Sequence, residues 1–206
     1  TRYAYLSLTG QNCKITDVEI KVDSEPVRRD YIPRIAPEVS FIDVPAGDVP
    51  NIQLDGWRTA ATAGIELKDL MQISFHSFSL PTARLIWHCP FVSIFSSDDG
   101  LIGGPNFREF ALIRLDGESW EEDSFASNRI ITNKSEDFGN WDEWKRKNKE
   151  GLDVDIRIKH VGDTITVSSE NAGIGFRNVT TIRADVPKLY VALTGDQCAI
   201  TNIRIR

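Results

Sequence analysis

The chain has 206 residues, 41% hydrophobic and 26% charged, which is the composition of one soluble globular domain with a sizeable core. Its net charge is −6 and it has no block of basic residues, so nucleic acid and anionic membrane surfaces are not the expected partners. No apolar run reaches the length of about 20 residues that a membrane span requires, and membrane insertion is not expected.

Two segments near the ends of the chain repeat each other. Residues 5–20 read YLSLTGQNCKITDVEI and residues 190–205 read YVALTGDQCAITNIRI, with a constant offset of 185. Each copy has the pattern of a strand, a turn after Thr-Gly and a second strand. The copies are either two equivalent strand pairs at an edge of one sandwich, or residues 1–20 are the tail of a preceding unit in a tandem array. We favour the array, because it accounts directly for a duplication at near-domain spacing. The chain also begins inside this strand-like pattern, which suggests a fragment of a larger protein.

The three cysteines are Cys13, Cys89 and Cys198. They form no CxxC pair, so the sequence signals neither a zinc site nor a disulfide framework. Their apolar neighbours indicate buried thiols. A disulfide between Cys13 and Cys198 stays open, because the first explanation of the repeat would bring the two residues together.

Residues 21–50 contain five prolines and scattered charges, which predicts a connector on the surface. Residues 51–206 form the predicted sandwich domain. Period-two patterning and turn residues predict strands in this domain. The predicted strands cover residues 51–57, 71–80, 82–89, 91–97, 108–115, 152–159, 164–169, 173–182 and 189–195.

One short helix is predicted within WDEWKRKNKEG, residues 141–151. Asn140 is a suitable N-cap, Glu143 takes the capping-box position and Gly151 ends the helix. Trp141 and Trp144 are expected to pin the helix to a sheet. About a dozen strands with one helix and no βαβ rhythm predict an all-β antiparallel sandwich or barrel.

The order of ISFHSFS, RLIWHCPFVSIFSSDDG, FREFALIRLDG and IRIKHVGDTITVSSEN resembles the concanavalin A-like (LamG-like) jelly-roll domains. The likeness covers roughly residues 50–206 and is closest to lectin-like modules attached to larger multidomain bacterial proteins. It implies an antiparallel β-sandwich of the jelly-roll type. It also implies a polysaccharide or oligosaccharide ligand and an extracellular or cell-surface location, although the cysteine pattern permits the cytoplasm.

The sequence contains no catalytic motif that would make the chain an enzyme. The nearest approach to the carboxylate pair of a glycoside hydrolase is Glu118 with Glu122, in a segment that reads as a solvated loop. His88 and Cys89 are adjacent, and adjacent side chains on a strand face opposite sides, so they cannot cooperate as base and nucleophile. A glycoside hydrolase is therefore the third hypothesis.

One loop could hold a metal ion. Asp98, Asp99 and Asn106 bracket a Gly-rich stretch, and Ca²⁺ prefers such oxygen ligands. Asp-Gly turn chemistry explains the same residues without a metal. A structural calcium ion is thus the one cofactor that the sequence leaves open.

The residues that favour ligand binding are polar and aromatic groups on predicted strands and loops. We expect His76, Arg84, His88 and Arg114 to share one face of one sheet, and Trp57 and Trp120 to lie in loops beside turns. Such side chains supply the aromatic stacking and planar hydrogen bonding that pyranose rings require. A solvated outer sheet face would explain the same His and Arg residues. The first hypothesis is a non-catalytic carbohydrate-binding module, and the second is a structural or protein-interaction module that contacts neighbouring domains of an array.

Overall fold

The chain forms two compact units, residues 1–34 and 35–206. A computed structural model describes residues 14, 16–19, 44–81, 83, 88–120 and 125–206, and for Ser119 and Trp120 it describes the backbone alone. All strands and the helix given below belong to the second unit. The predicted connector, residues 21–50, lies outside the described residues up to residue 43, and of the rest only Val49 makes a β-bridge, to Ile203.

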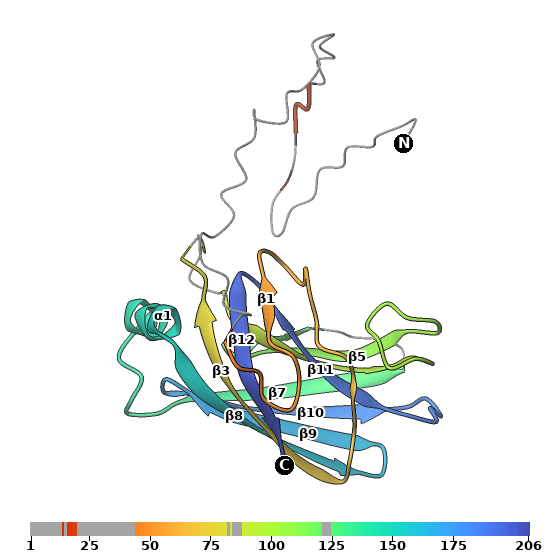
Figure 1. The fold of residues 1–206 in the computed structure, drawn as a ribbon. Helices are drawn as coiled ribbons and strands as arrows, with labels where there is room; N and C mark the ends of the chain where they lie inside the picture. The colour runs from red at the N-terminus through yellow and green to blue at the C-terminus, as the bar shows by residue number, and fades with distance from the viewer. Residues whose placement is uncertain (1–13, 15, 20–43, 82, 84–87, 121–124) are drawn as a thin grey trace. The chain divides into compact units, whose positions relative to one another are not determined.

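The second unit consists of strands and one helix, drawn in Figure 1. The elements are β1 (Ile52–Leu54), β2 (Ile65–Glu66), β3 (Leu70–Ser79), β4 (Pro90–Ser96), β5 (Arg108–Arg114), β6 (Ser119–Trp120), β7 (Ala126–Lys134), α1 (Trp141–Glu150), β8 (Leu152–Val161), β9 (Thr164–Asn171), β10 (Ile174–Ile182), β11 (Tyr190–Gly195) and β12 (Cys198–Ile205).

These strands form two antiparallel sheets. One sheet has seven strands in the order β1-β12-β3-β8-β9-β10-β7, and the other has five in the order β2-β11-β4-β5-β6. Their inner faces contribute to one hydrophobic core. The domain is an antiparallel β-sandwich of the jelly-roll class with one short helix, so the predicted fold class is confirmed.

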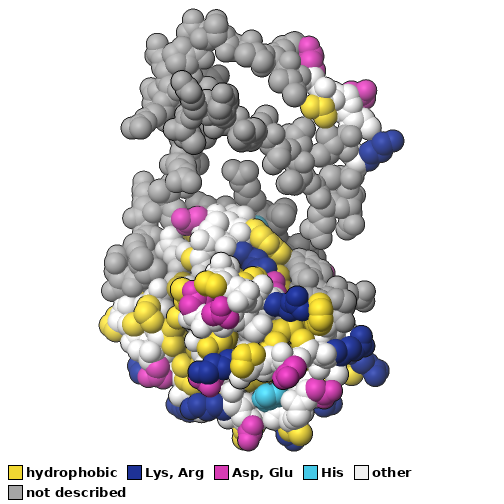
Figure 2. Space-filling view, turned by 90° about the vertical axis from the view of Figure 1, so that its right-hand side faces the viewer, with side chains coloured by type: hydrophobic (Ala, Val, Ile, Leu, Met, Phe, Trp, Pro, Cys, Tyr) yellow, Lys and Arg dark blue, Asp and Glu magenta, His cyan; other side chains and the backbone are white. Residues whose placement is uncertain are grey.

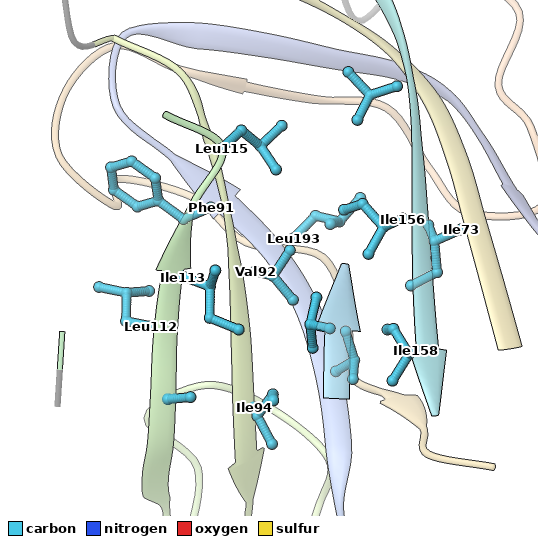
Figure 3. Close-up of a cluster of buried hydrophobic side chains, with 14 of the residues drawn as sticks. Ile73, Phe91, Val92, Ile94, Leu112, Ile113, Leu115, Ile156, Ile158 and Leu193 are labelled. Carbon is cyan, nitrogen blue, oxygen red and sulfur yellow. The ribbon is translucent and has the colours of Figure 1, made fainter. Parts of the chain in front are cut away.

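The core follows from alternation along the strands. In β8 the side chains of Val154, Ile156 and Ile158 are buried, while Asp155 and Arg157 between them are exposed. Figure 3 shows Ile156 and Ile158 facing the side chains of the five-stranded sheet, whereas Phe91 and Leu112 point away from this layer. Inward positions of both sheets therefore build the core.

The strands β11 and β12 connect the two layers. They follow each other in the chain, but β11 pairs with β2 and β4 in one sheet and β12 pairs with β1 and β3 in the other. The connection is the turn from Gly195 to Cys198. Each strand of this pair, which we call the closing strand pair, thus lies between two neighbours.

The helix α1 begins and ends as its sequence predicts. The Asn140 side chain accepts a hydrogen bond of 2.9 Å from the backbone N–H of Glu143, and Gly151 ends the helix with a positive φ of 105°. Trp144 is fully buried and its ring lies edge-on to that of Trp141, with centroids 5.8 Å apart. The helix packs beside β3, at the left of Figure 1.

Other predictions met different outcomes. No predicted strand corresponds to β7, because its sequence lacks alternation and it lies at the edge of its sheet. In the predicted strand 82–89, residues 82 and 84–87 lie outside the described residues, and His88 and Cys89 belong to no strand. Cys89 and Cys198 are free and fully buried, as expected, and burial raises the pKa of both thiols; Cys13 lies outside the described residues.

We expect Ile158→Ala to destabilise the domain by about 2–5 kcal/mol, because it removes a fully buried side chain from the core and leaves a cavity. Val161→Ala, in the same strand but at an exposed position, should change the free energy of unfolding by less than about 0.5 kcal/mol. Urea denaturation followed by circular dichroism measures both. Equal losses in the two variants would contradict the layer assignment.

Candidate functional site

His76 lies on the outer face of the seven-stranded sheet, in β3. Its side chain is 40% exposed, and its Nδ1 lies 2.8 Å from a carboxylate oxygen of Asp153, the residue opposite it in β8. The ring of Phe78 lies beside it, with centroids 5.9 Å apart. His76 is therefore an oriented surface group that a ligand could reach.

His88 lies elsewhere and is buried. It precedes β4 in the other sheet and is 2% exposed. Its Nδ1 lies 2.8 Å from Asp196 and its Nε2 lies 3.2 Å from the side-chain nitrogen of Gln197, while its backbone oxygen accepts a hydrogen bond from Ser79. These contacts tie the start of β4 to the turn of the closing strand pair, which is a structural role.

Arg114 is also buried, at 7% exposure, near the end of β5. Its guanidinium pairs closely with Asp116 and lies 3.0 Å from Glu118. It also lies over the ring of Phe91, 5.6 Å from the centroid. Burial raises the pKa of Asp116 to about 6, although the charge of Arg114 acts in the opposite direction.

Trp57 is 47% exposed. Its ring contacts the ring of Phe91, with the two centroids 4.8 Å apart. Trp57 and Arg114 therefore both lie against the ring of Phe91, which points away from the layer between the sheets. Trp120 is in β6 of the same sheet, where its backbone pairs with Leu112, and Arg84 lies outside the described residues.

The expectation of one shared sheet face is wrong for the residues that the structure describes. His76 belongs to the seven-stranded sheet, Arg114 to the five-stranded sheet and His88 to no strand. The pattern failed because alternation assigns a face within a strand but not the sheet to which that strand belongs.

The loop with the proposed metal ligands is closed by its own hydrogen bonds. The Asn106 side-chain nitrogen donates to Asp98 over 2.8 Å, and an oxygen of Asp99 accepts from the backbone N–H of Leu101 over 3.0 Å. In the part of the chain that the structure describes, no group of three His, Cys, Asp or Glu residues could hold a metal ion. Because Asn106 presents a donor towards Asp98, these residues do not fit a calcium ion as they stand.

The described surface includes three grooves of ligand size. The first, of about 770 Å³, lies on the outer face of β8 and β9 and includes Asp155, Arg157 and Glu170 but no aromatic residue. The second, of about 670 Å³, we call the rim groove; it is lined by residues 96–98, 106–108, Phe125 and 183–188. The third, of about 470 Å³, lies between His76, Phe78 and the end of α1.

The rim groove combines aromatic and planar polar groups. Phe125 is 39% exposed, and the guanidinium of Arg108 lies over its ring, 3.9 Å from the centroid. Asp98 and Asn106 hold each other in place, as described above, and the exposed Arg183 and Asp185 come from the connection between β10 and β11. The backbone N–H of Arg183 bonds to the oxygen of Phe125, which fixes the two segments together.

Sequence reasoning missed this groove as a ligand site. It selected Asp98 and Asn106 as metal ligands, but Arg108, Phe125 and Arg183 are far apart in sequence and meet only in the folded domain. The one local signal is the charged, Pro-containing run RADVPK at residues 183–188. Figure 2, which views the right-hand side of Figure 1, shows charged side chains of both signs interspersed with hydrophobic ones, and no large area of one charge.

Comparison with known proteins adds little to this picture. No family model matches the sequence, and a comparison with curated proteins finds no significant match. Among solved structures, the chain is similar to the carbohydrate recognition domain of Emp47p, with 11% identity, a TM-score of 0.35 and coverage of 80% of this chain and 91% of that one. It is also similar to the Ca²⁺- and mannose-bound exoplasmic/lumenal domain of VIP36, with 13% identity, a TM-score of 0.35 and coverage of 79% and 75%. Similarity at this level carries no information about ligand, location or activity.

The raised pKa of Asp116 predicts a pH-dependent stability. Between its ordinary value of 3.8 and about 6, the folded state binds more protons at this group than the unfolded state, so stability falls as pH rises through this window. Asp116→Asn removes the titration. We compare the free energies of unfolding of Asp116→Asn and of the unsubstituted protein. Between pH 4 and pH 7 the difference between them should shift by about 2 kcal/mol in favour of the variant.

Urea denaturation at the two pH values measures this difference. Asp163→Asn is the matched control, because it makes the same substitution at an exposed carboxyl. The difference for this control should change far less. A difference for Asp116→Asn that is the same at both pH values would show that the pKa of this carboxyl is not raised in the folded protein.

Proposed function

We propose that the domain is a non-catalytic carbohydrate-binding module of a larger multidomain protein, and that the rim groove binds the glycan. One observation supports this choice above all. Of the three grooves, the rim groove is the one that joins an exposed phenylalanine ring to fixed carboxylate, amide and guanidinium groups. An extracellular or cell-surface location, implied by the sequence resemblance, is part of the same proposal.

The chemistry of the groove suits a neutral sugar. A pyranose ring packs its C–H face on an aromatic ring, and its paired hydroxyls bond to planar donors and acceptors. The exposed part of the Phe125 ring supplies the first contact. Asp98 supplies hydrogen-bond acceptors and Arg183 supplies donors. Neither side chain forms a salt bridge with another described residue of the groove.

The proposal includes no catalytic step. Glu118, one of the two carboxylates nearest to a hydrolase pair in the sequence, is paired with Arg114, and Glu122 lies outside the described residues. The proposal also gives calcium no part in glycan binding, since Asp98 and Asn106 are held in place by their hydrogen bond.

A second function, a structural or protein-interaction module, is favoured by the repeat of residues 5–20 and 190–205. Tandem units commonly contact their neighbours through extended surfaces. The two functions differ in what the rim groove does, so a glycan-binding measurement separates them.

We expect Phe125→Ala to weaken glycan binding about 3- to 10-fold, the value of one aromatic contact, and Arg183→Ala to weaken it about 10-fold or more. A glycan array identifies the ligand, and titration calorimetry then gives the affinities with and without EDTA. Binding should survive EDTA.

Ile131→Ala is the matched control, since it removes another exposed hydrophobic side chain, on β7, and should leave the affinity unchanged. Trp57→Ala and His76→Ala test the two exposed residues selected from the sequence. Loss of binding in either of these, with Phe125→Ala unaffected, would move the site away from the rim groove. Absence of any bound glycan would favour the interaction module.

A further inference from the structure

The structure explains the repeat at the two ends of the chain. Its second copy, residues 190–205, is the closing strand pair β11–β12. Between the copies, Tyr, Leu, Thr, Gly, Cys, Ile and Thr recur in register, 185 positions apart. The role of each shared residue can therefore be read from the copy inside the domain.

Burial, a hydrogen bond or lack of space restricts the residue type at the shared positions of the closing strand pair. Thr194 is buried and donates a hydrogen bond of 2.7 Å to the backbone oxygen of Ala60. A Cβ atom on Gly195 would lie 2.8 Å from the backbone oxygen of Cys89, closer than real Cβ atoms come. Cys198 and Ile200 are both fully buried. The first copy has the same four residue types, at Thr9, Gly10, Cys13 and Ile15.

The backbone supplies a second, independent likeness. Asn202 has a φ of 52°, in the left-handed region that few non-glycine residues adopt, at the irregularity where the pairing of β12 with β3 shifts register. Asp17, the equivalent residue of the first copy, has a φ of 54°. At this one position the two copies therefore share a left-handed residue as well as a sequence pattern.

At three described positions the first copy is exposed where the second copy is buried. Val18 is 54% exposed, whereas its equivalent Ile203 is fully buried, and Thr16 is exposed where Thr201 is buried. Lys14 stands where the second copy has the fully buried Ala199, which pairs with Gln53 of β1 and Phe78 of β3.

Within the domain of residues 35–206, the positions that a closing strand pair takes are already occupied. β11 already lies between β2 and β4, and β12 between β1 and β3. A second molecule of this chain would have the same places filled. The complementary structure is therefore a sandwich of the same kind that has no closing strand pair of its own.

We propose that residues 5–20 are the closing strand pair of another sandwich domain of this type, which precedes this one in the polypeptide. Chain order supports the placement, because β11–β12 are the last elements of their domain and residues 5–20 would be the last elements of the one before. The partner is thus a homologous sandwich that ends at β10, and residues 5–20 fill its two sheets.

A fusion tests this proposal directly. Residues 35–185 are placed immediately before Thr1 of the full chain, so that residues 1–4 stand where residues 186–189 stood and the register of the repeat is kept. We expect two folded sandwiches in one monomeric chain. The cooperative unfolding signal per chain, followed by circular dichroism, should be about twice that of the unfused protein, because the signals of two folded domains add.

Two substitutions make the result specific. Gly10→Val, at the position where Gly195 has no room for a side chain, should return the signal to that of one sandwich. Lys14→Ala, which introduces the residue of the second copy, should keep both sandwiches. The control is a chain in which residues 35–206 are fused directly before residues 21–206. It gives the signal expected of two complete domains. The proposal is overturned if this control shows two sandwiches and the test chain one, or if Gly10→Val keeps both.

Discussion

The turn between Gly195 and Cys198 joins the two sheets, and the rest of the sandwich depends on its geometry. Gly195 leaves no space for a side chain against the backbone of Cys89, whose oxygen also accepts a hydrogen bond of 3.1 Å from the N–H of Asp196. The buried His88 meets Asp196 from the other side. Because a buried polar group is stable only when it is hydrogen-bonded, His88 and the turn stabilise each other.

The same reasoning separates structural polar residues from those that can meet a ligand. Arg114 and His88 are conspicuous in the sequence, but each is enclosed and paired with a carboxylate. Arg183 and Phe125 are inconspicuous, and they reach solvent in a groove formed by connections at the end of the sandwich. Loops held by a rigid scaffold commonly carry function, while buried pairs keep the scaffold in one arrangement.

Local patterns predicted most of the fold and little of the site. Alternation marks Ile156 and Ile158 as buried, and the caps at Asn140 and Gly151 mark the helix, because each signal acts over a few residues. The edge strand β7 has no such signal. The assignment of strands to two sheets, and the approach of Asp98 to Arg183 across the rim groove, depend on contacts between distant segments that no local pattern encodes.

The repeat links the fold to the site. In this domain the residues just before β11 line the rim groove, including Val186 and Lys188. At the same register the first copy has Thr1 and Tyr3. If residues 5–20 close a preceding sandwich, its rim would carry a small hydroxyl and an aromatic ring where this domain has an aliphatic side chain and an ammonium group. The closing strand pairs, constrained by burial, would then stay alike while the rims beside them diverge, so that two units of one architecture recognise different ligands.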